Sequence, residues 1–149
     1  IEPLRVTVTG ENPGWKRSAS LDVPREAPFF GDHFPRRAVF PATLLLDTML
    51  RLALDGAVGA PALSGAAPRA LKVTHVKMRS FIEPGQHLDL DVELADIADA
   101  SHGNQPAARA DHGGWPAVDA GNAVLRAMLF ARTAGRMVAT ARVEIGGVR

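Results

Sequence analysis

One short stretch of the sequence carries residues whose types and spacing could do chemistry. Residues 29–35 read Phe-Phe-Gly-Asp-His-Phe-Pro, and Asp47 follows fourteen residues after His33. An imidazole can take a proton near neutral pH, and a carboxyl held in an apolar pocket can donate one. Together they are the groups of general acid–base catalysis. His33 and Asp47 are therefore the first candidate pair.

The pattern after this stretch predicts a long helix that carries Asp47. Pro41 suits the first turn of a helix, where its missing N–H removes no hydrogen bond. Residues 42–55 continue without Gly or Pro and are rich in leucine, and Gly56 is a natural stop. A helix with so many leucines is expected to be buried over most of its surface.

Alternating patterns elsewhere predict strands around this helix. They are expected at residues 4–8, 15–23, about 70–81, 87–94, 123–133 and 136–145, with turns at 9–14, 83–86 and 134–135. Residues 97–121 show little periodicity and are expected to form a long loop. The order predicts an α+β fold in which one antiparallel sheet wraps around one helix.

Composition excludes several classes of function. The chain has 149 residues, enough for one domain spanning 1–149, with 46% hydrophobic residues and no cysteine or tyrosine. Disulfides, cysteine-ligated metals and phenol acids are thereby excluded. The net charge of +1 gives no general attraction for nucleic acid, and no stretch is apolar enough to span a membrane. The N-terminal residues lack a secretory pattern, so a cytoplasmic protein is expected.

No spacing of histidines suits a metal. His75, His87, His102 and His112 form no paired-ligand motif, and no phosphate-binding or serine-hydrolase motif occurs. We therefore expect neither a metal nor a nucleotide cofactor.

Residues 30–47, Phe-Gly-Asp-His-Phe-Pro-Arg-Arg-Ala-Val-Phe-Pro-Ala-Thr-Leu-Leu-Leu-Asp, resemble the signature of the 3-hydroxyacyl-[acyl carrier protein] dehydratases of the FabZ/FabA type. In that family a His-Phe-Pro or similar tripeptide precedes a Pro-Gly helix start, and an acidic residue follows fourteen positions after the histidine. His33, Pro41 and Asp47 occupy those places. Residues 76–86 resemble, more weakly, the family's strand and Pro-Gly-Asp turn.

The resemblance implies a hot-dog fold and a homodimer whose site is shared between protomers. It implies dehydration of a 3-hydroxyacyl thioester, carried on phosphopantetheine by acyl carrier protein or CoA, in fatty-acid or polyketide-like synthesis. His33 of one protomer would be the base, and Asp47 of the other would be the acid. The backbone N–H of Ala42 would bind the thioester oxygen, because the first N–H groups of a helix are unpaired.

Two further sets of residues surround this signature. Residues expected to line an acyl tunnel are Phe30, Phe34, Phe40, Pro41, Met78 and Phe81. Basic residues expected to dock an acidic carrier protein are Arg36, Arg37, Lys77 and Arg79. The plainer interpretations are that the apolar set is core and that the basic set is unrelated and solvated. Asp47 could likewise form an ordinary exposed pair with Arg51.

Two other functions stay open at this point. A non-catalytic acyl-binding or partner subunit stays open because of three departures from the family pattern. Arg36 and Ala42 stand where the family has glycine, and the loop at 97–121 is longer than the family's. A hot-dog thioesterase would act on similar substrates. It would need a carboxylate to activate water, and the sequence offers no acidic partner beyond Asp47.

Overall fold

The computed structural model describes residues 5–12, 16–32, 34–97 and 122–148. The elements in chain order are β1 (Arg5–Asn12), β2 (Lys16–Asp22), α1 (Phe29–Asp32), α2 (Ala42–Ala57), the 3-10 turn η1 (Pro61–Leu63), β3 (Ala67–Met78), β4 (His87–Asp96), β5 (Ala123–Thr133) and β6 (Arg136–Val148). None of the helices in these ranges is long and apolar enough to cross a membrane.

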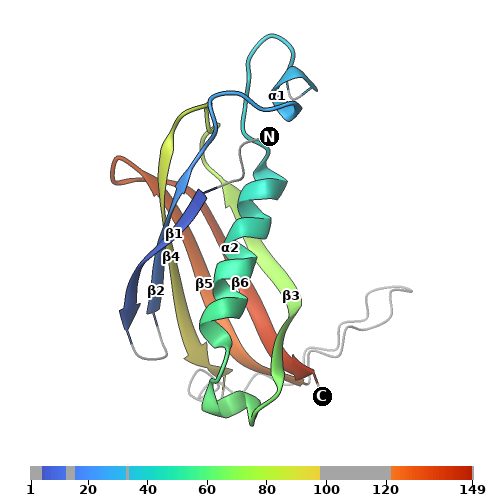
Figure 1. Ribbon diagram of the computed structural model, residues 1–149. Coiled ribbons are helices and arrows are strands. Elements are labelled where there is room, and N and C mark those ends of the chain that lie inside the picture. Colours follow the sequence, from blue (N-terminus) through green and yellow to red (C-terminus); the bar gives the residue numbers. More distant parts are fainter. Residues whose placement is uncertain (1–4, 13–15, 33, 98–121, 149) are drawn as a thin grey trace, which may run out of the picture.

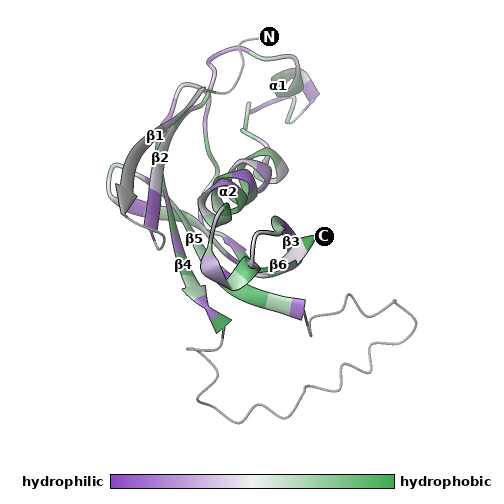
Figure 2. Cartoon of the chain, turned by 60° about the horizontal axis from the view of Figure 1, so that its bottom comes forward, coloured by the Kyte–Doolittle hydropathy of each residue, from purple (hydrophilic) through white to green (hydrophobic). Residues whose placement is uncertain are grey.

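The strands form one antiparallel sheet that curves around α2. Their order is β1-β2-β4-β5-β6-β3, so β1 and β3 are the edges. Helix α2 contacts β2, β3, β4, β5 and β6. Figure 1 shows α2 lying along the sheet, and Figure 2, which looks closer to the helix axis, shows the sheet bending around one side of it. The predicted α+β architecture is confirmed.

The core lies between α2 and the concave face of the sheet. From α2 it takes Leu45, Met49, Leu52, Ala53 and Ala57, and from β4 it takes Leu88, Leu90, Val92 and Leu94. The β4 residues are the alternating set that the sequence assigned to one face, so that prediction is confirmed. Burial of these side chains from water is what holds the helix against the sheet.

Helix α2 is less buried than its leucine content predicted. Thr43, Asp47, Arg51 and Asp55 are exposed, and their spacing of four residues places them in one stripe along the helix. The sheet covers the opposite face of the helix. The prediction of burial over most of the helix surface is therefore wrong for the single chain.

Turn geometry follows the residues that the sequence marked. Ala134 and Gly135 both have positive φ, 49° and 77°, as the two-residue hairpin between β5 and β6 requires. Gly85 has φ of 81° in the turn before β4, where a left-handed residue suits glycine.

Several boundaries differ from the predictions. Residues 29–32, which none of the predicted strands or helices includes, form the short helix α1. Strand β1 runs on to Asn12 through the predicted turn, because a register shift between Val8 and Gly10 lets the strand continue as a bulge. Strand β3 covers residues 67–78 rather than about 70–81. Most of the predicted loop at 97–121 lies outside the described residues.

Candidate active site

The segment between α1 and α2 is held against the segment that follows β3. The ring of Phe29 meets Phe30 and Phe40 edge to face, with centroids 4.7 and 5.9 Å away. The backbone N–H of Phe40 donates to the carbonyl of Ile82 at 2.7 Å. These contacts fix where α2 begins. His33, the predicted base, lies outside the described residues.

Helix α2 starts with donors that no turn of the helix can satisfy. The carbonyl of Pro41 accepts hydrogen bonds from the N–H groups of Leu44 and Leu45, at 3.1 and 3.3 Å. Ala42 is the first residue of the helix, so its own N–H has no carbonyl one turn earlier to donate to. The positive end of the helix dipole lies at this N–H and further favours a developing negative charge there.

A cavity of about 330 Å³ lies beside this helix start, which we call the larger cavity. It is mostly apolar and is lined by Phe34, Val39, Phe40, Ala42, Met78, Arg79, Ser80 and Phe81. The structure therefore brings Ala42 together with four of the residues predicted for the acyl tunnel. Phe40 is core, at 1% exposure, whereas Phe34 and Phe81 are 51% and 64% exposed. The core interpretation consequently holds for Phe40 and fails for Phe34 and Phe81.

Two of the predicted tunnel residues are not among the residues that line this cavity. The half-buried ring of Phe30 packs against Phe29 and the hydrophobic core instead. Pro41 is the residue preceding α2, and its carbonyl is used by the first helical turn. Within the single chain, Phe30 therefore packs against the core. Pro41 is the N-cap residue of α2.

A second cavity, of about 130 Å³, adjoins the first and is called here the smaller cavity. Its lining residues are Ala42, Thr43, Leu46, Met49, Val76, Met78, Ala139 and Thr140. It lies between α2 and the edge strand β3 with its neighbour β6. Sequence reasoning missed this cavity, because its walls come from segments that only the fold brings together.

Asp47, the predicted acid, lies on the exposed stripe of α2. Its carboxylate Oδ2 accepts a hydrogen bond from the Arg51 Nε at 2.8 Å, and its side chain is 57% exposed. Neither cavity includes Asp47 among its lining residues. Within one chain Asp47 therefore has the geometry of an ordinary exposed ion pair. The described part of the chain supplies no apolar setting for its carboxyl.

The four predicted docking residues are all exposed, but they differ in their contacts. Arg37 forms an ion pair with Glu83 at 2.8 Å, and its guanidinium lies 6.0 Å from the ring centroid of Phe81. Arg79 lines the larger cavity. The Arg37–Glu83 pair joins the two segments on either side of this cavity. Sequence reasoning missed it, because the two residues are 46 positions apart.

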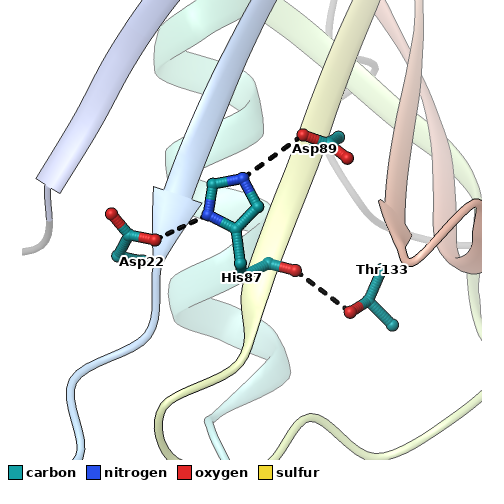
Figure 3. Close-up of polar contacts among 4 residues, drawn as sticks. All are labelled: Asp22, His87, Asp89 and Thr133. Atoms are coloured by element: carbon teal, nitrogen blue, oxygen red, sulfur yellow. Dashed lines mark hydrogen bonds and ion pairs between the residues drawn. The ribbon is translucent and has the colours of Figure 1, made fainter.

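A separate titratable cluster lies at the start of β4. The His87 Nδ1 is 2.6 Å from Asp22 Oδ1 and its Nε2 is 3.4 Å from Asp89 Oδ1, as Figure 3 shows. The hydrogen bond to Asp22, together with the charges of both carboxylates, raises the pKa of His87 above its usual value. The three side chains project from the strand face that α2 does not cover. They line neither cavity, so we assign them no part in the candidate site.

Comparison with solved structures defines the class of fold. A thioesterase superfamily member 2 from zebrafish matches with a TM-score of 0.60 at 9% identity, covering 97% of this chain and 81% of that one. The dehydratase heterocomplex ApeI:P from Xenorhabdus doucetiae matches with a TM-score of 0.58 at 14% identity, covering 95% and 98%. At these identities the match concerns the fold alone, and it is the hot-dog fold of thioesterases and dehydratases.

Sequence comparison then gives the family. The model of the ApeI-like dehydratases matches residues 11–105, and the chain belongs to that family. A FabZ 3-hydroxyacyl-[acyl-carrier-protein] dehydratase from Symbiobacterium thermophilum is 28% identical over 82 residues, 55% of this chain and 58% of that protein. The chain thus spans about three fifths of the length of the curated relatives it matches. The predicted resemblance to FabZ-type dehydratases and the predicted hot-dog fold are confirmed.

Proposed function

We propose that this protein dehydrates a 3-hydroxyacyl thioester to the trans-2-enoyl thioester and water, using its own side chains and no cofactor. The observation that carries the proposal is the apolar cavity at the start of α2. Ala42 lines it, and Phe34, the residue directly after His33, lines it as well. The dehydratase family match and the FabZ relatives support the same reaction.

The proposed chemistry needs one base, one acid and one donor to the thioester oxygen. The His33 imidazole takes the proton from C2, and negative charge moves onto the thioester oxygen, where the Ala42 N–H stabilises it. The bond from C3 to its hydroxyl oxygen then breaks as Asp47 gives that oxygen a proton. The leaving group departs as water, and the double bond forms between C2 and C3. General acid–base help of this kind contributes about 10²–10⁴ in rate.

We place a second chain over Asp47, because the described residues of one chain leave it exposed. In the proposed homodimer the carboxyl of one protomer enters the apolar cavity of its partner, where loss of water favours its protonated form. Edge strand β3 supports this arrangement, since it flanks both cavities and exposes Val76 and Met78. The thioester arrives on phosphopantetheine, carried by acyl carrier protein or CoA. The exposed Arg36, Arg79 and Lys77 suit an acidic carrier.

The test is an assay of the purified protein in both directions of the reaction. We expect it to hydrate crotonyl thioesters and to dehydrate 3-hydroxybutyryl thioesters. His33→Ala and Asp47→Asn should each lower kcat by about 10²-fold or more. Asp55→Asn, on the same exposed stripe of α2, is the matched control and should leave kcat unchanged. Full activity of both site variants would refute the proposed roles.

The second candidate is a non-catalytic partner subunit, which the exposed Asp47–Arg51 pair favours. The solved ApeI:P dehydratase is titled a heterocomplex, and a similar pairing here would combine this chain with a different hot-dog subunit. In that case the purified protein alone would neither hydrate nor dehydrate any thioester. Release of free thiol from acyl thioesters would instead indicate a thioesterase.

A further inference from the structure

Arg37 contacts both of the exposed phenylalanines that line the larger cavity. Its guanidinium lies 6.0 Å from the ring centroid of Phe81. Its backbone is joined to that of Phe34 by two hydrogen bonds, in which the N–H of each residue donates to the carbonyl of the other, at 3.1 and 3.2 Å. These two bonds close a four-residue turn, so a shift of Arg37 also shifts Phe34.

The carboxylate that binds Arg37 belongs to a turn that is fixed to the sheet. The Glu83 N–H donates to the Gln86 Oε1 at 2.8 Å, and the Gln86 N–H donates back to the carbonyl of Glu83 at 3.3 Å. The N–H of Val23, directly after β2, donates to the carbonyl of Gln86 at 2.9 Å, and the Gly85 N–H donates to the carbonyl of Val23 at 3.1 Å. Glu83 therefore offers Arg37 an acceptor in a fixed place, at 2.8 Å.

The segment that leads into α2 is thus tied to the segment after β3 at two points. One is the hydrogen bond from the Phe40 N–H to the carbonyl of Ile82, between two fully buried residues. The other is the Arg37–Glu83 ion pair, which lies outside the core with both side chains exposed. The buried bond fixes the end of the segment that enters α2. The ion pair fixes the end that follows His33 in the sequence.

We propose that Arg37 and Glu83 form a clasp, a pair of positioning residues that holds the segment after His33 against the larger cavity. The inference rests on the function proposed above, which makes His33 the base. The N–H of Phe34 belongs to the peptide bond with His33, so holding Phe34 in place also holds the peptide group next to the base. The rate of an oriented proton transfer depends steeply on such placement. Because Glu83 and Phe81 already engage its guanidinium, this assignment takes Arg37 out of the predicted docking set.

The test measures hydration of a crotonyl thioester of pantetheine, a substrate without a carrier protein. Arg37→Gln and Glu83→Gln should each lower kcat about three- to fivefold with KM unchanged, the effect expected when one exposed ion pair is lost. The double variant should lose no more than either single variant, because both changes remove the same interaction. Arg132→Gln is the matched control and should keep the wild-type kcat. Arg132 binds Asp91 at 3.0 Å and lies 5.4 Å from the ring centroid of Phe130, the same two kinds of contact, but it lines neither cavity.

A docking role for Arg37 would give a different pattern. Arg37→Gln would then raise KM only for thioesters borne by an acidic carrier protein. Glu83→Gln would lower that KM, because it removes a negative charge and releases the guanidinium. This pattern would refute the clasp, and so would an unchanged kcat in both single variants or losses that multiply in the double variant.

Amide hydrogen exchange distinguishes a failure of this inference from a failure of the proposed reaction. The N–H groups of Phe34 and Arg37 should exchange about three- to fivefold faster in Glu83→Gln than in the wild type, and at the wild-type rate in Arg132→Gln. If the wild type hydrates no thioester but this faster exchange is found, the clasp stands and the proposed reaction falls. If the wild type is active and Glu83→Gln keeps its full kcat, the clasp is refuted and the reaction stands.

Discussion

The carboxyl of Asp47 has two different settings, depending on how many chains are considered. In one chain it is exposed and bound to Arg51 at 2.8 Å, a kind of pair that contributes little to stability. In the proposed reaction it must donate a proton, and a carboxyl does so near neutral pH when it is removed from water. In the proposed homodimer a second chain would cover Asp47, and sequence spacing alone could not show that.

His87 shows how a histidine can be strongly paired without serving the site. Asp22 and Asp89 favour its protonated form in the folded state, so its pKa is raised there. This contribution to stability is fully present below the unfolded pKa of about 6.5 and is lost as the pH rises through the higher folded value.

We therefore expect His87→Gln to lower the urea midpoint more at about pH 5.5 than at about pH 8.5. Urea unfolding across that range measures the difference. His75→Asn is the control, because His75 is exposed, contacts the Thr74 hydroxyl and has a positive φ that asparagine tolerates. A loss in His87→Gln that is the same at both pH values would contradict the expected linkage.

At the scale of elements, α2 combines a structural face with a functional one. Its buried residues anchor it in the curved sheet, and its first turn brings Ala42 to the larger cavity. Because the helix is rigid, packing at one face fixes the position of its N-terminus. A residue that only packs thus also determines the geometry of the candidate site.

Leu45→Ala should lower the free energy of unfolding by about 2–5 kcal/mol, because Leu45 is fully buried and its loss leaves a cavity. Leu54→Ala, a half-buried leucine of the same helix, should cost clearly less. Urea unfolding of the two variants beside the wild type gives both values. Equal losses would mean that α2 is not held by the face that the structure assigns to the core.

At the scale of the whole molecule, strand β3 is an edge with apolar side chains. Val73, Val76 and Met78 are exposed on it, and natural edge strands of this kind are normally covered or paired. A second copy that pairs along β3 would cover these side chains and bring another α2 close to each pair of cavities. The homodimer inferred from the family resemblance would thus complete both the sheet edge and the site.

We expect the wild type to sediment as a dimer and Val76→Lys to shift it toward the monomer, since a lysine on an edge strand opposes pairing. Val58→Lys is the matched control, because Val58 is an exposed valine that follows the C-terminal end of α2 and does not belong to β3. Analytical ultracentrifugation over a range of concentrations measures the equilibrium. A dimer of unchanged strength in Val76→Lys would place the interface elsewhere, and β1 is the other edge of the sheet.

The sequence by itself determined the local features. Helix α2 follows from Pro41, the leucine-rich run and the stop near Gly56, and β4 follows from its strict alternation. The hairpin between β5 and β6 follows from Ala134 and Gly135. These features depend on residues that are close together in the chain, and a sequence pattern consists of such residues. The motif around His33 could be recognised for the same reason, although His33 itself lies outside the described part of the chain.

Only the tertiary structure decided which distant residues meet. It joined Phe34 to Phe81 in one cavity, bound Arg37 to Glu83, and left Asp47 in water beside Arg51. Each of these outcomes depends on how the sheet curves and where its edges fall. Curvature and strand order arise from the packing of all strands against α2 at once, and no local spacing encodes that packing.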